Sequence, residues 1–377
     1  GDIINFNTLR RFFGLIKTEF NPSKNTLNIL SRYCGYESFQ NFTSSFQIQP
    51  NKENNELLIA YLVDIFRSVA VNNEYDETFH LIVQKSVSYL LKFPGIKNEF
   101  YRKIVRTENG RNYYFEQYFH IDELATYYGQ GIMYYLAAGK NNRHQVFGYS
   151  VLCMRAWLMN NDSELEACYQ KLESFKTDTD LSNDIASRVF SARLFYANIK
   201  NQPTGTIIKS AKEYYSKIES NYTNNSPPVF EQIFSFSLIL TGHFPEALYY
   251  LNRGFLQYSK YKVNSWYKFI YNEDWFYLGM GIIHAYYGEI EVGKAYYHKI
   301  NISKSSVLSK RTGAAFLQIL KSLLSVHDKS GLKYFNRLIK DTSFYRLKNF
   351  YKEILDNQQS AKFELSVKNK QKLKNEQ

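Results

Sequence analysis

The 377-residue sequence predicts an all-α protein whose larger part consists of stacked helix hairpins. Proline and glycine are scarce, with 7 and 18 residues, as expected where long helices dominate and helix breakers are confined to turns. Aromatic residues make up 17% of the chain, too many for all to face solvent, so most rings pack between elements. A turn, followed by a helix with a small residue and an aromatic three positions later, recurs through the second half.

Residues 1–46 predict a small helical module. Thr8 to Ile16 forms a short helix whose apolar residues follow i, i+3, i+4, i+7 spacing, whereas Asn7, Arg10 and Arg11 fall on the opposite side. A second helix begins after Ser23, a suitable N-cap, and ends before Gly35, which suits the C′ position. A third helix then carries a stripe of phenylalanines, Phe39, Phe42 and Phe46.

Residues 47–142 predict a linking helical region that opens with a polar stretch at 47–55. Apolar periodicity places its helices at 56–71, 76–92, 95–106 and 122–138. The aromatic run 111–119 is compatible with a strand, but its helical neighbours favour a helix. Glycines 129 and 131 lie inside a helical pattern, which indicates close helix packing.

Residues 143–357 carry the repeats, and 358–377 form a basic polar tail. Each aligned copy has a turn, a second-helix position that holds Ala or Gly in three copies but Glu166 or Leu332 in the other two, and an aromatic three residues later. The turns are Asn161, Asn201, Gly242, Gly288 and His327; the middle positions are Glu166, Ala211, Ala247, Gly293 and Leu332; the aromatics are Tyr169, Tyr214, Tyr250, Tyr296 and Phe335. A small residue lets the two helices approach, and we expect the aromatic to fill the gap to the next hairpin.

The copy at 242–251 (GHFPEALYYL), with the aromatic helix 230–240 before it, resembles a tetratricopeptide (TPR) unit, and 286–297 is the next best match. The resemblance covers about residues 143–341. It implies a right-handed α–α superhelix of TPR-like helix hairpins, whose concave surface is lined by the first helices and receives a peptide or protein segment.

The segment 7–15 (NTLRRFFGL), followed by 22–36 (PSKNTLNILSRYCGY), is similar to a motif of bacterial helix-turn-helix regulatory proteins. That resemblance implies a partial helix-turn-helix module in which Asn7, Thr8, Arg10 and Arg11 face double-stranded DNA. The alternative is an ordinary amphipathic helix with a solvated basic side. The helices that normally precede this motif are missing here, and we expect sequence upstream of Gly1.

Net charge and cysteine spacing bear on the partners and the cellular compartment of the chain. A net charge of +12 favours polyanionic partners, but a solvated lysine-rich surface is the simpler explanation of charge alone. Three scattered cysteines, Cys34, Cys153 and Cys168, form no disulfide framework. Without an apolar run of about 18 residues or a signal peptide, we expect a cytoplasmic protein with no membrane contact.

The sequence displays no catalytic constellation: G-x-S-x-G, P-loop and dinucleotide-binding motifs do not occur. The seven histidines have no metal-ligand spacing, so we expect no metal, no cofactor and no enzymatic activity. Recurrent tyrosine doublets serve either as stacking platforms or as inter-helix packing, and their repeat position favours packing.

The predicted function is therefore regulatory, with a solenoid that senses a peptide or protein and an N-terminal module that engages DNA. An interaction scaffold without DNA binding is the alternative.

Overall fold

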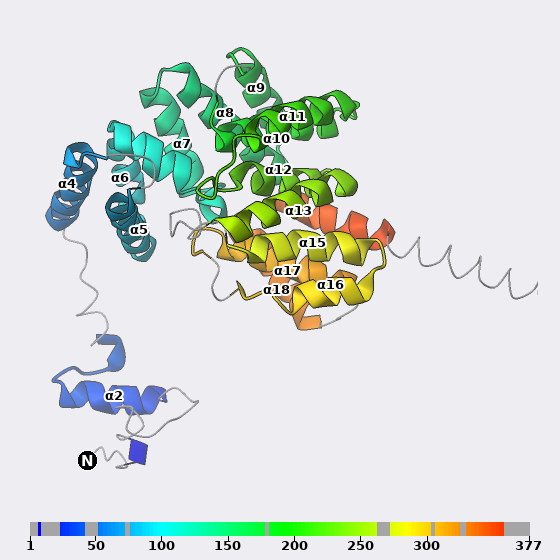
Figure 1. Ribbon diagram of the computed structural model, residues 1–377. Coiled ribbons are helices and arrows are strands. Elements are labelled where there is room, and N and C mark those ends of the chain that lie inside the picture. Colours follow the sequence, from blue (N-terminus) through cyan, green and yellow to red (C-terminus); the bar gives the residue numbers. More distant parts are fainter. Residues whose placement is uncertain are drawn as a thin grey trace, which may run out of the picture. The chain divides into compact units, whose positions relative to one another are not determined.

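The computed structural model describes residues 7–8, 23–41, 52–71, 76–177, 181–261, 272–302, 306–324 and 329–357, and in these ranges all regular structure is helical, without a strand (Figure 1). The predicted all-α class is thus confirmed. The chain divides into two units, Gly1–Tyr61 and Leu62–Gln377.

The first unit contains α2 (Lys24–Tyr33), which starts and ends as its sequence predicts. The Ser23 hydroxyl accepts a hydrogen bond from the Thr26 amide at 3.1 Å. Gly35 takes a positive φ of 84°, and the Tyr36 amide donates to the Ser31 carbonyl at 3.0 Å, which closes a Schellman motif. Of the helix predicted at 8–16, only residue 8 belongs to the described ranges, and it is helical.

The linking region carries four predicted helices, and all four are present. They are α4 (Lys52–Ser68), α5 (Glu77–Lys92), α6 (Lys97–Ile104) and α7 (Tyr127–Ala138). The last begins later than predicted because Ile121–Glu123 forms a separate 3₁₀ turn, η3. Another 3₁₀ turn of three residues, η1 (Pro94–Ile96), precedes α6.

The ambiguous aromatic run forms a π-helix, η2 (Gly110–Gln117). Such helices are rare because their wider turn weakens backbone packing. Here the aromatic core compensates: Tyr114 and Phe115 are both fully buried, and the Tyr114 ring lies edge-on to Phe100 at 5.4 Å. Gly110 permits the tight entry, since a Cβ there would lie 2.2 Å from the Ile104 carbonyl oxygen. The helix predicted here is therefore present, in the i→i+5 form.

The rest of the second unit is a stack of helix hairpins in two layers (Figure 1). The first helices pack side by side in chain order: α8 (Asn142–Leu158), α10 (Asn183–Ile199), α12 (Val229–Leu240), α15 (Asp274–Tyr286) and α17 (Lys310–Leu323). Each is followed by a second helix packed against it: α9 (Asp162–Glu173), α11 (Gly205–Glu219), α13 (Phe244–Lys260), α16 (Ile290–Tyr297) and α18 (Lys329–Thr342). No residue of α12 is exposed, as expected for a central helix covered on all sides.

Four hairpins turn on a residue in the left-handed conformation: Asn160 (φ 61°), Asn201 (49°), Gly242 (81°) and Gly288 (82°). In each, the following amide donates to a carbonyl five residues earlier, as in the bond from His243 to Leu238 at 2.8 Å. Three predicted turn residues are thus confirmed. The fourth is one residue late, because Asn160 makes the turn while Asn161 caps α9 through the Glu164 amide. His327 lies outside the described residues.

The predicted small positions hold in three copies and fail in two. Ala211, Ala247 and Gly293 are buried between helices. Glu166 instead pairs with Lys200 at 2.9 Å, and Leu332 is 49% exposed. In those two copies the buried residue is the preceding one, Leu165 or Gly331. One residue is about 100° of helix rotation, which suffices to turn the side chain away from the neighbouring helix.

The five predicted aromatics all lie against other rings. The ring pairs are Tyr169–Tyr196, Tyr214–Phe230, Tyr250–Phe234, Tyr296–His284 and Phe335–Tyr351, with centroids 4.0, 5.5, 5.3, 5.6 and 4.7 Å apart. Three of them reach the next helix after their hairpin, as expected. Tyr250 and Tyr296 instead contact the first helix of their own hairpin.

Tyrosine doublets serve mainly as packing, as predicted. In five of the seven, one ring is buried: Tyr114, Tyr128, Tyr135, Tyr215 and Tyr250. The close packing predicted at the paired glycines also holds, because a Cβ on Gly131 would lie 2.8 Å from the Phe115 ring.

Candidate functional site

Successive first helices converge on one apolar cavity of about 80 Å³, here called the first-helix cavity. Four of these helices contribute lining side chains: Met154 from α8, Arg188 from α10, Phe236 among others from α12, and Trp275 from α15. The site is therefore distributed over four helix hairpins, and its shape depends on how the hairpins stack.

Aromatic rings form one wall of this cavity. Phe236 lies edge-on to Trp275 at 5.0 Å and to Phe316 of α17 at 5.1 Å. On another side, the Arg188 guanidinium lies 3.9 Å from the centroid of the Phe119 ring, and the arginine is 3% exposed. A cation held against rings in this way is suited to an apolar ligand that carries a carbonyl or carboxylate group.

One long-range contact joins η3 to the last described hairpin of the second unit. The Asp122 carboxylate accepts hydrogen bonds from the Arg311 and Thr312 amides at 2.7 and 2.9 Å, and from the Thr312 hydroxyl at 2.7 Å. These amides belong to the first turn of α17, where no intrahelical acceptor exists. Burial raises the pKa of Asp122, and its hydrogen bonds oppose that shift. Asp122 thus caps a helix that starts 188 residues further along the chain.

A second long-range contact is made by the helical residues 345–357. Their apolar side, with Leu347, Phe350 and Ile354, is buried. Arg346 forms an ion pair with Asp162 at the start of α9, and its guanidinium lies 5.4 Å from the Trp157 ring. The chain therefore returns from its last described hairpin to the first. Together with the Asp122 cap, this is called the closing contact below.

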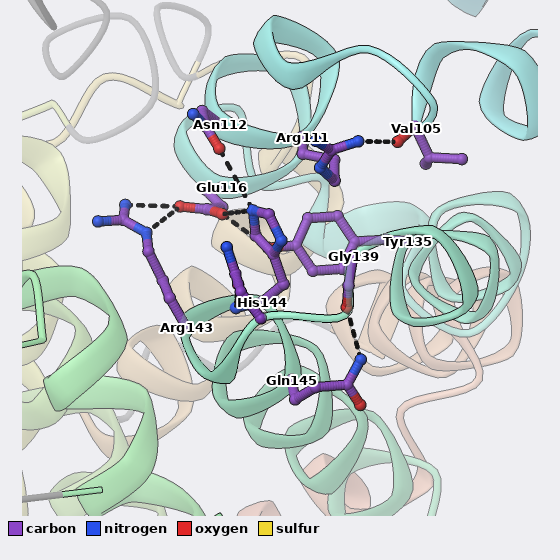
Figure 2. A network of polar contacts seen from close by, with 10 residues as sticks. Val105, Arg111, Asn112, Glu116, Tyr135, Gly139, Arg143, His144 and Gln145 are labelled. Carbon is purple, nitrogen blue, oxygen red and sulfur yellow. Dashed lines mark hydrogen bonds and ion pairs between the residues drawn. The ribbon is translucent and has the colours of Figure 1, made fainter. Parts of the chain in front are cut away.

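A buried polar network links η2, α7 and α8 (Figure 2). Glu116, 2% exposed, accepts hydrogen bonds from the Tyr135 hydroxyl at 2.6 Å and from Arg143 Nε and a terminal nitrogen at 3.1 and 2.7 Å. Burial raises the pKa of Glu116, and Arg143 opposes that shift. His144 Nε2 lies 3.8 Å from the carboxylate; burial, with the charges of Arg111 and Arg143, lowers the pKa of His144 to about 4.

This network is best understood as a junction between elements. Both oxygens of Glu116 accept hydrogen bonds from side chains on α7 and α8, and neither Glu116 nor His144 lines the first-helix cavity. At neutral pH His144 is uncharged, so the Glu116 charge is balanced by Arg143. These hydrogen bonds connect the π-helix to α7 and α8.

The sequence-predicted nucleic-acid residues lie in the first unit. Asn7 and Thr8 are helical, the first exposed and the second half-buried. Arg10 and Arg11 lie outside the described residues, so the four-residue face stays a prediction.

Within the described residues no group of three or more His, Cys, Asp and Glu side chains has a geometry that holds a metal ion. Nor does any helix of the described ranges combine the length and apolar character needed to cross a bilayer.

Sequence reasoning missed the residues of the closing contact and of the polar network. Asp122 and Arg346 each bind a partner more than 180 residues away, and no local pattern marks such a pair. Glu116 lies in an aromatic run, where a lone carboxylate was the only available signal.

Comparison with known proteins gives no assignment: no family model matches the chain, and no match was found to a curated protein or to a solved structure.

Proposed function

We propose that the chain is a non-enzymatic, cytoplasmic regulatory protein. In this proposal a TPR-like right-handed superhelix binds a peptide or protein segment, and the N-terminal module contacts double-stranded DNA. The observation that carries the binding role is the first-helix cavity, to which four successive first helices each contribute a side chain. Surfaces of this kind, built from repeats, are suited to binding extended partners.

The likeness to TPR proteins rests on local features. Four hairpins turn on left-handed residues, and Ala247 and Gly293 let the helices approach. The DNA-binding role rests on the resemblance of residues 7–36 to a helix-turn-helix motif, and the cytoplasmic location on the scattered cysteines.

A partner peptide would insert one apolar side chain into the first-helix cavity. The volume of about 80 Å³ suits a single side chain and no more. The rings of Phe236 and Trp275 would contact that side chain, and the Arg188 guanidinium would lie near the peptide carbonyls or carboxylate. Binding would change the stacking of the first helices, and this change would reposition the DNA-binding module.

Selection of random displayed peptides on the full chain tests the binding site. Selected peptides are then titrated against the chain and two variants, Met154→Ala in the cavity and Leu256→Ala on α13, where the side chain is 58% exposed. We expect the dissociation constant to rise about tenfold for Met154→Ala, which corresponds to about 1.4 kcal/mol, and to stay unchanged for the control. Equal affinity of all three proteins would place the binding surface elsewhere.

Titration of the chain with DNA duplexes distinguishes a DNA-binding regulator from an interaction scaffold that does not bind DNA. We expect the full chain to bind duplex DNA with an affinity that falls steeply with salt, and the double variant Arg10→Ala, Arg11→Ala to lose that binding. If the chain binds a selected peptide but no duplex, the interaction scaffold is the better description.

A further inference from the structure

A second cavity, of about 290 Å³, lies between the segment that contains η3 and the last described hairpin. It is called the η3 cavity here. Its walls come from elements far apart in sequence: His120 and Asp122 on one side, Lys310 and Arg311 at the start of α17, and Arg337 on α18. The cavity is larger than the first-helix cavity and is lined by different residues.

Cations are in excess around the η3 cavity. Lys310, Arg311 and Arg337 are exposed, and no side-chain ion pair of theirs occurs among the described residues. Opposite them stand Asp122 and Asp341. The remaining carboxylate, Glu123, is paired with Lys97, so that pair counts as neutral. Three cations against two carboxylates leave one net positive charge. The Asp122 carboxylate also already accepts hydrogen bonds from the first-turn amides of α17.

A buried histidine lines the same cavity. His120 is 2% exposed, and within the described part of the chain neither of its ring nitrogens has a hydrogen-bond partner. Its ring is held in place by stacking on Tyr128, with centroids 5.2 Å apart, and by Tyr114 at 5.5 Å. Buried polar groups are nearly always hydrogen-bonded, so this fixed imidazole is a polar group whose hydrogen bonds a water or a bound molecule would complete.

The protonation of His120 defines what that molecule must offer. Burial, with the nearby Lys97 charge, lowers the pKa of His120 to about 3. At neutral pH the ring is therefore uncharged, with one N–H donor and one acceptor nitrogen. A ligand oxygen can accept from the first, and a hydroxyl can serve both.

We propose that the η3 cavity binds a small organic anion, whose carboxylate or phosphate group contacts Lys310, Arg311 and Arg337 and whose other end hydrogen-bonds to His120. The apolar part of the ligand lies against Leu308, Leu338 and the Tyr334 ring. A volume of about 290 Å³ is near the lower limit of small-molecule sites, which suits a ligand of about a dozen non-hydrogen atoms.

Such a ligand would strengthen the closing contact. It would bridge the η3 segment and the α17–α18 hairpin beside the Asp122 cap, which already joins them. The anion would therefore stabilise the closed stack and regulate the protein independently of any peptide in the first-helix cavity.

Thermal unfolding of the full chain tests this proposal with three probes at constant ionic strength: phenyl phosphate, benzoate and, as the uncharged match, benzyl alcohol. Each is compared on the wild type, on Lys310→Gln and Arg337→Gln, and on Lys333→Gln, which makes the same charge change at an exposed position of α18 outside the cavity. We expect at least one anion, at saturating concentration, to raise the unfolding midpoint of the wild type and of Lys333→Gln by about 2 °C or more, and to lose that shift in both cavity variants. Which anion acts tells a phosphate ligand from a carboxylate ligand.

Histidine-selective NMR provides a second measurement that does not depend on variant stability. The ring signals of His120 should shift on titration with the active probe, because the imidazole gains a partner. A midpoint shift of equal size in all four proteins would mean nonspecific anion binding, and it would overturn the proposal. So would an unchanged midpoint with all three probes, or His120 signals that do not move.

Discussion

Replacement of Asp122 by alanine should destabilise the second unit through one well-defined set of hydrogen bonds. The carboxylate is the acceptor for two amides in the first turn of α17 and for the Thr312 hydroxyl, at 2.7 to 2.9 Å. Loss of a helix cap costs about 1 kcal/mol, and a buried N–H left without an acceptor costs about 1–3 kcal/mol. Part of this is offset, because burial disfavours the charged Asp122, as its raised pKa indicates. We therefore expect the free energy of unfolding to fall by about 2–3 kcal/mol.

Urea denaturation, followed by circular dichroism and tryptophan fluorescence, measures this loss. Asp122→Asn retains one acceptor oxygen and should lose less than Asp122→Ala. Thr312→Val removes only the hydroxyl donor and should lose about 1 kcal/mol. If Asp122→Ala loses no more than Thr312→Val, the carboxylate does not cap α17 in solution and the closing contact has been misassigned.

Three further predictions concern buried charge, close packing and the second half of the closing contact. Burial raises the pKa of Glu231 to about 7, so between about pH 4.5 and 7 the folded state keeps a proton that the unfolded state releases. The free energy of unfolding should therefore fall by about 3 kcal/mol as the pH rises through this range. Glu231→Gln should abolish that part of the stability–pH profile. Gly254→Ala places a methyl group 2.7 Å from the Phe276 ring and should lower the free energy of unfolding by about 1–3 kcal/mol. Gly205 has open space around it, so Gly205→Ala should be neutral or slightly stabilising. Equal effects of the two variants in urea denaturation would show that Gly254 is not closely packed. Arg346→Ala should speed hydrogen exchange in residues 345–357 while leaving α2 unchanged, and unaltered exchange there would show that the ion pair with α9 contributes nothing.

Local features of the fold were predictable because their chemistry is local. Gly242 and Gly288 mark turns, because the left-handed backbone conformation that ends many helices favours glycine. Ser23 marks a helix start for the same kind of reason. The consecutive asparagines at 160 and 161 show the limit: both suit the turn, and only the folded chain shows which one adopts it. Because of that one-residue error, the predicted position between the helices is Glu166, whereas the residue buried there is Leu165.

Features that depend on distant partners were not predictable. The π-helix at 110–117 differs from an α-helix by one residue in its hydrogen bonding, and residue propensities do not distinguish the two. The carboxylates of Glu116 and Asp122 are buried because of partners on other elements, and a sequence pattern reads a charged residue as exposed. For the candidate site, the resemblance to TPR units implied a binding surface lined by first helices, which stays a prediction, and it did not indicate which of their side chains meet in one cavity.

We propose above that partners bind at the first helices of the stack. Hydrogen–deuterium exchange of the full chain, with and without a selected peptide, tests it most directly. Binding should slow exchange at the amides of α8, α10, α12 and α15 that surround the first-helix cavity, and leave the exposed side of α13 unchanged. Protection confined to the second helices or to the first unit would contradict it.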